Sequence, residues 1–139
     1  MKNILTIGIT THGSHISKDI IDFLKGQPVT VIISEDKDIN QNKLPDFVFE
    51  LKESGTKTEY YFSEKQGIAN NRQNILNHVQ TKYFYTIDND DKMTGNLSEL
   101  NSFLSATDFD LLYVKCYEDG KYMRVPTGFL YMCTWMQIY

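Results

Sequence analysis

Short apolar segments alternate with amphipathic ones along most of the chain. Four segments rich in β-branched and aromatic residues predict strands, and their nearly continuous apolar character is typical of strands covered on both faces. Three amphipathic segments between them carry apolar side chains at helical spacing and predict helices. The predicted strands are residues 4–9, 29–33, 58–62 and 83–87, and the helices begin near Ser14 or Ser17, at Pro45 and at Gly67.

This alternation of strand and helix predicts the α/β class, with a Rossmann-like, mostly parallel sheet flanked by helices. The pattern changes after Asp91. Residues 97–104 predict a further helix, and residues 110–117 and 121–125 predict a C-terminal β-hairpin around a Glu-Asp-Gly turn. There is no repeat, linker or low-complexity segment, so we expect a single domain over residues 1–139.

The third predicted helix, residues 67–80, carries Ile68, Arg72, Ile75, Leu76 and Val79 on one side. Arg72 lies among these apolar residues. An arginine in that position either extends its charge to the surface or directs it into a crevice, and position alone favours neither.

Composition limits the classes of function. With 139 residues, 41% hydrophobic and 23% charged, the chain resembles an ordinary soluble domain. A net charge of −4 with dispersed lysines and arginines argues against a nucleic-acid partner. No apolar run is long enough for a membrane span or typical of a signal peptide, so we expect a cytoplasmic protein. Cys116 and Cys133 have no metal-site spacing and are expected to be reduced thiols.

Polar and acidic residues gather where the predicted strands end. The segments there read TTHG, SEDKD, SEKQG and DNDD. Parallel sheets bind ligands at the carboxyl ends of their strands, and Mg²⁺ is typically held by one or two carboxylates together with substrate phosphate oxygens. Asp88 and Asp90 therefore suggest a site for a metal-bound diphosphate. Taken alone, such a short acidic motif is more often a solvated turn or a helix cap. Neither a GxGxxG nor a P-loop pattern is present.

Together these segments resemble the nucleotide-sugar-dependent glycosyltransferases of family 2, which have the GT-A fold. The segment TIGITTHG is similar to that family's first strand and its Pro-Thr-Tyr-Asn ending, with Thr11 matching and Thr10 replacing the proline. The segment VIISEDKD is similar to the second strand and the acidic loop that reads the base, where Glu35 is the matching position and Asp36 the alternative.

Two later segments extend the resemblance. QGIANNRQNIL is similar to the family's Gly…Ala-Arg-Asn helix, with Gly67 and Arg72 matching and Gln73 in place of the usual Asn. YFYTIDNDD is similar to the strand that carries the DxD motif. The resemblance implies Mn²⁺ or Mg²⁺ bound by Asp90, with Asp88 or Asp91 as further ligands. It also implies nucleotide-binding roles for Thr10, Thr11, Glu35, Asp36, Arg72 and Asp88.

The implied function is transfer of a sugar from a nucleotide-diphosphate sugar, with UDP as the expected nucleotide, to a glycan or other hydroxyl acceptor. The alternatives are a donor-binding fragment without turnover, a sugar-nucleotide pyrophosphorylase, and an interaction domain that needs no metal. A pyrophosphorylase ranks low because its Gly-rich basic loop is missing: TTHGSHIS has one Gly and no Arg or Lys before Lys18.

The expected catalytic base is missing from the sequence. Transfer to a hydroxyl needs a carboxylate to accept the proton, and no acid follows Asp119, which lies in the predicted hairpin turn. We therefore identify no catalytic residue and expect a donor-binding portion without the acceptor and base segment. Apolar residues around Trp135 would then lack partners, which favours self-association. Peripheral membrane association of a full-length protein is compatible with the resemblance.

Overall fold

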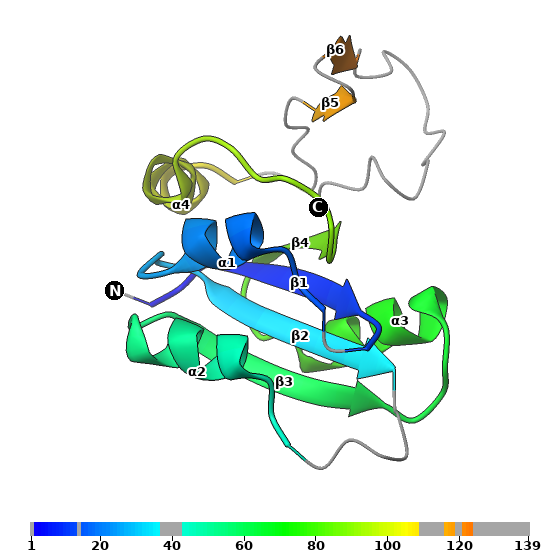
Figure 1. Ribbon diagram of the computed structural model, residues 1–139. Helices are drawn as coiled ribbons and strands as arrows, with labels where there is room; N and C mark the ends of the chain where they lie inside the picture. The colour runs from blue at the N-terminus through cyan, green and yellow to red at the C-terminus, as the bar shows by residue number, and fades with distance from the viewer. Residues whose placement is uncertain (1, 14, 37–42, 109–115, 119–120, 124–139) are drawn as a thin grey trace.

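The computed structural model describes residues 2–13, 15–36, 43–108, 116–118 and 121–123. Strands and helices alternate along this part of the chain up to β4 (Figure 1). The elements in order are β1 (Leu5–Thr11), α1 (Lys18–Leu24), β2 (Thr30–Asp36), α2 (Asp46–Glu53), β3 (Lys57–Ser63), α3 (Ile68–His78), β4 (Tyr83–Asp88), α4 (Leu97–Ala106), β5 (Cys116–Glu118) and β6 (Lys121–Met123).

The first four strands form one parallel sheet in the order β3-β2-β1-β4. The chain adds β2 and then β3 on one side of β1, and returns to add β4 on the other side. Helices α1 and α2 cover one face of the sheet, and α3 covers the other (Figure 1). The predicted α/β class with a parallel sheet is confirmed. The order of strands reverses between β1 and β4, which is where open α/β sheets bind ligands.

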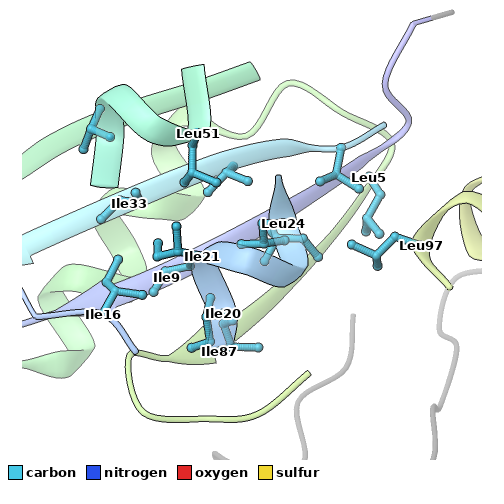
Figure 2. Packing of buried hydrophobic residues seen from close by; sticks show 14 of the residues in the cluster. Leu5, Ile9, Ile16, Ile20, Ile21, Leu24, Ile33, Leu51, Ile87 and Leu97 are labelled. Atoms are coloured by element: carbon cyan, nitrogen blue, oxygen red, sulfur yellow. The ribbon is translucent and has the colours of Figure 1, made fainter. Parts of the chain in front are cut away.

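The hydrophobic core lies between the sheet and the helices α1 and α2 (Figure 2). Alternate residues of each strand face it, as the pleat of a strand requires. Ile20 and Leu24 of α1 and Leu51 of α2 pack there with 0% exposure, against Ile9 and Ile33 of the central strands. This packing holds the carboxyl ends of the strands at fixed positions relative to one another.

The apolar side of α3 is buried only in part. Ile68 and Leu76 are 51% and 39% exposed, whereas Asn71 and Ile75 are 2% and 0% exposed. Ile75 packs over Gly8 of β1, where a Cβ atom would lie only 2.6 Å from Ile75 Cγ2. Asn71 can be buried beside it because the sheet supplies hydrogen-bond partners for its amide.

The strands are longer than the apolar pattern predicts. Strand β1 continues to Thr11 and β2 to Asp36, and the parallel ladder pairs Thr10 with Ser34 and Thr11 with Glu35. These residues were expected in loops. Their backbones are instead fixed by the sheet, so the candidate residues of β1 and β2 lie on rigid elements.

Helix α1 begins after Ser17, whose hydroxyl accepts a hydrogen bond from the Ile20 amide at 3.4 Å. Of the two predicted caps, Ser17 is therefore the one observed. In the C-terminal part, β5 and β6 pair antiparallel, with Cys116 opposite Met123. The remainder of the predicted hairpin and residues 124–139 lie outside the described residues. Within the described ranges, no helix has the length and apolar character needed to cross a membrane.

Candidate functional site

Three of the predicted site residues meet at the carboxyl ends of β1 and β4. Thr10 and Asp88 are register partners in neighbouring strands. Asp88 Oδ1 accepts hydrogen bonds from Thr10 Oγ1 and from Arg72 Nη2, both at 3.1 Å. The Arg72 side chain is 18% exposed and that of Asp88 is 34% exposed. Arg72 therefore directs its charge toward the carboxyl end of β4 and not along the surface.

One donor of Arg72 is unused in the described part of the chain. Its Nε atom is buried and has no hydrogen-bond partner there. A buried donor without an acceptor costs about 1–3 kcal/mol. Native structures retain few such groups, and each one that persists calls for an explanation, such as strain, a functional role or a bound water or ion.

The acidic turn after β4 is closed by its own backbone. Asp91 Oδ2 accepts from the Asp88 amide at 2.9 Å, and the Asp91 amide donates to the Asp88 carbonyl at 3.2 Å. Burial of its carboxyl in this turn raises the pKa of Asp91, although the residue as a whole is exposed. The nearby charges of Asp88 and Asp90 raise this pKa further, while the Asp88 amide and Arg72 oppose the shift.

Asp90 differs from its two acidic neighbours. It is exposed, and its carboxylate makes no hydrogen bond or ion pair among the described residues. Asp88 Oδ2 also makes no hydrogen bond in that part of the chain, because Thr10 and Arg72 both donate to Asp88 Oδ1. Three carboxylate oxygens of Asp88 and Asp90 are therefore open to a ligand.

These oxygens fit only one kind of metal site. No group of three or more His, Cys, Asp or Glu side chains within the described residues could hold a metal ion by itself. Mg²⁺ and its analogues are commonly held by one or two carboxylates with substrate phosphate oxygens completing the shell. The pair Asp88 and Asp90 fits a cation shared with a diphosphate, and does not fit a cation held by these side chains alone.

The two predicted base-reading acids lie on opposite faces of the sheet. Glu35 is 0% exposed on the side of the hydrophobic core, and the Tyr60 hydroxyl donates to its Oε2. Asp36 faces α3. Its Oδ1 accepts from the Gly67 amide at 3.0 Å and from Asn71 Nδ2 at 2.7 Å. The Asp36 side chain keeps 13% exposure, whereas Glu35 is fully enclosed by the fold.

The other oxygen, Asp36 Oδ2, is 3.3 Å from Nδ1 of His12. The His12 side chain is 83% exposed and that of Asp36 is 13% exposed. The strand ends of β1 and β2 are therefore joined by a contact at the rim of the crevice. Among the described residues, no hydrogen bond or ion pair joins Asp36 and His12 to the Thr10, Arg72 and Asp88 cluster, although β1 and β2 are neighbours in the sheet.

Thr11 has a different environment from Thr10. It is buried on the core face, and its hydroxyl donates to the His15 carbonyl at 2.7 Å. Asn89 Nδ2 donates to the same carbonyl, and the Asn89 carbonyl accepts from the Ser17 amide. These bonds tie the loop after β1 to the end of β4. The observed contacts of Thr11 thus brace the loop, and its nucleotide-binding role stays a prediction.

Sequence reasoning missed three polar residues behind the site: Ser34, Asn71 and Asn74. Ser34 Oγ donates to Asn71 Oδ1 at 2.8 Å and accepts from Asn74 Nδ2 at 2.9 Å. The available signal was the helical spacing of Asn71, Ile75 and His78, which places them on one face of the helix. This face is less apolar than the one with Ile68 and Leu76, so the pattern of apolar residues did not single it out. The predicted lack of a catalytic base concerns residues 119–139, of which only 121–123 are described.

Comparison with known proteins adds the family. The family model described as glycosyl transferase family 2 matches residues 9–125, and so covers every candidate residue named above. No curated protein matches the chain. The expected resemblance is confirmed by this match, and the parallel α/β sheet agrees with the GT-A architecture. The chain therefore belongs to glycosyltransferase family 2, whose members in general bind a nucleotide-sugar donor and an acceptor.

Proposed function

We propose that this chain binds a UDP-sugar together with a divalent cation and serves transfer of the sugar to a hydroxyl acceptor. The observation that carries the proposal is the Thr10, Arg72 and Asp88 cluster, which includes a buried Arg72 donor without a partner in the described chain. This cluster lies between β1 and β4, where the strand order reverses. Open α/β sheets bind nucleotides at such points.

The roles divide between the two ends of the DxD motif. Asp88 is held by Thr10 and Arg72, so it is suited to positioning the nucleoside part of the donor. Asp90 is exposed and unpaired among the described residues, so it is suited to the cation. When bound, Mn²⁺ or Mg²⁺ would act as a Lewis acid that neutralises the departing diphosphate. Arg72 would add a fixed positive charge from the protein.

For the nucleobase we propose Asp36 in preference to Glu35. A carboxylate accepts a hydrogen bond from the ring N–H of uracil, whereas cytosine presents a lone pair at that position. A site built around a buried acceptor rejects a ligand that lacks the matching donor. What supports Asp36 is that one of its oxygens is fixed against α3 while the other contacts only the exposed His12 side chain among the described residues.

Calorimetry tests the metal-dependent part of the proposal. UDP should bind in Mn²⁺ and bind much more weakly in EDTA. Asp90→Ala should remove most of the metal-dependent affinity, a loss on the order of 2–5 kcal/mol for a charged partner. Glu53→Ala is a matched control, since Glu53 is an exposed acid at the end of α2, away from the strand ends.

Two outcomes would contradict the proposal separately. Equal binding of UDP in EDTA and in Mn²⁺ would remove the metal role of Asp90. Absence of UDP binding under both conditions would remove the nucleotide site itself. A donor-hydrolysis screen across a panel of nucleotide sugars would then identify the sugar, and transfer to a hydroxyl acceptor would establish turnover.

A further inference from the structure

A buried polar relay connects the interior of the sheet to Asp36. Asn74 Nδ2 donates to Ser34 Oγ, Ser34 Oγ donates to Asn71 Oδ1, and Asn71 Nδ2 donates to Asp36 Oδ1. The three distances are 2.9, 2.8 and 2.7 Å. Ser34 is 0% exposed and Asn71 is 2% exposed, so the bond between them is shielded from water, and the two outer bonds are partly buried.

The relay has a single direction. The Ser34 hydroxyl oxygen accepts a hydrogen bond from the Asn74 amide, so the hydroxyl hydrogen can be donated to the Asn71 carbonyl oxygen. That contact fixes which end of the Asn71 amide faces β2, and the amide nitrogen is left facing Asp36. The carboxylate of Asp36 is the terminal acceptor of the relay.

The consequence for Asp36 is that its two oxygens become unequal. Oδ1 accepts from both Asn71 and the Gly67 amide at the start of α3, so its hydrogen-bonding directions toward the protein are used. Among the described residues, the one partner of Oδ2 is His12, whose side chain is exposed. An acceptor held in one orientation discriminates between ligands better than one that rotates.

We propose that Asn71 is a positioning residue for base selection: it locks Asp36 so that Oδ2 presents a single hydrogen-bond acceptor to the nucleobase. This inference rests on the proposed role of Asp36 in the nucleotide site. Asn71 does not touch the ligand. It acts through Asp36, and Ser34 acts through Asn71.

The experiment measures the ratio of the CDP to the UDP dissociation constant, in Mn²⁺, for the wild-type chain and its variants. Asn71→Ala should reduce this preference about tenfold, the scale of one lost hydrogen bond to a charged group. The ratio of UDP affinities in Mn²⁺ and in EDTA should not change, because Asp90 and the diphosphate are untouched. Asn77→Ala is the matched control: it removes an exposed asparagine from the same helix and should change neither ratio.

A double-mutant cycle separates positioning from a general structural role. In the Asp36→Ala background, Asn71→Ala should cause no further change in base preference, because its effect passes through Asp36. A further change there would overturn the inference. Ser34→Ala provides a second variant should Asn71→Ala fail to fold, and it should reduce the preference in the same direction.

The outcomes also distinguish this inference from the function on which it rests. If the wild-type chain binds no UDP, or binds UDP and CDP equally, the proposed nucleotide site or the role of Asp36 is wrong and the inference falls with it. If the wild type prefers UDP and both Asn71→Ala and Ser34→Ala keep that preference, only the inference is overturned.

Discussion

Asp88 illustrates how single residues make this acidic strand end possible. Three carboxylates within four residues repel one another unless cations or donors are placed beside them. Here Asp88 is neutralised by Arg72 and hydrogen-bonded by Thr10, and Asp91 accepts from the backbone amide of Asp88. Asp90 alone of the three has no such contact among the described residues. Asp90, with both carboxylate oxygens unbonded in that part of the chain, is thus the acid best placed for an added cation.

Adjacent acids of β2 should give opposite phenotypes. Glu35→Ala removes the acceptor of the Tyr60 hydroxyl inside the core and should lower the free energy of unfolding by about 1–3 kcal/mol. It should leave the preference for UDP over CDP unchanged. Asp36→Asn should abolish that preference with a smaller effect on stability. Urea unfolding measures the change in stability, and calorimetry measures the preference for UDP over CDP. A loss of this preference in a fully folded Glu35→Ala chain would show that Glu35, and not Asp36, recognises the base.

At the scale of elements, α3 joins the core to the site. Its buried face places Ile75 against Gly8 of β1, and one turn earlier it places Asn71 against Ser34 and Asp36. Arg72 follows Asn71 directly and reaches Asp88. The register of α3 on the sheet therefore decides the position of both Asp36 and Arg72, and a change in its packing should affect both.

Gly8→Ala tests this close approach of helix and strand. The new Cβ would lie 2.6 Å from Ile75 Cγ2 and 3.4 Å from Thr86 Cγ2, and a β-branched side chain in a helix has little rotamer freedom to yield. Overpacking of this kind should lower the free energy of unfolding by about 1–3 kcal/mol. Urea denaturation measures the loss.

Ile75→Ala in the same chain provides the control for that substitution. If the clash is the cause, the double variant should be more stable than the sum of the two single losses predicts. Strict additivity would show that the close approach of Ile75 to Gly8 does not limit packing at this point.

At the scale of the whole molecule, the topology brings together strand ends that are distant in sequence. Thr10 and Asp88 are register partners although 78 residues separate them. Strand β4 is added beside β1 after β2 and β3 have filled the other side, so the strand order reverses between β1 and β4. A ligand there would contact the first and the fourth strand of the chain, which are neighbours in the sheet.

Ligand binding should therefore stabilise the sheet as a unit. UDP with Mn²⁺ at about a hundredfold excess over its dissociation constant should add about 2.7 kcal/mol to the free energy of unfolding, which thermal melting detects as a higher midpoint. EDTA should remove the shift. Asp90→Ala should melt within about 0.5 kcal/mol of the wild type without ligand, since Asp90 is exposed, and should lose the ligand-induced shift. A shift that persists in Asp90→Ala would contradict the metal role.

The sequence by itself determined the order of the elements and the α/β class. An apolar segment with strand or helix periodicity can bury its apolar side chains only in that type of element. The sequence therefore predicted β1 to β4 and the helices between them within a few residues of their observed bounds. The acidic ends of the strands were visible for the same reason, because each follows an apolar run. The family match over residues 9–125 agrees with this reading.

Only the tertiary structure decided which side of each strand end faces the crevice. Glu35 and Asp36 are equivalent acids in the sequence, but the pleat of β2 turns one into the core beside Tyr60 and the other toward Asn71. The buried face of α3 was likewise decided by contacts, since Gly8 admits Ile75 and Ser34 satisfies Asn71. The apolar pattern of a sequence indicates which side chains are stabilised by burial. It does not indicate whether a distant strand supplies the space and the hydrogen bonds that make burial of an asparagine favourable.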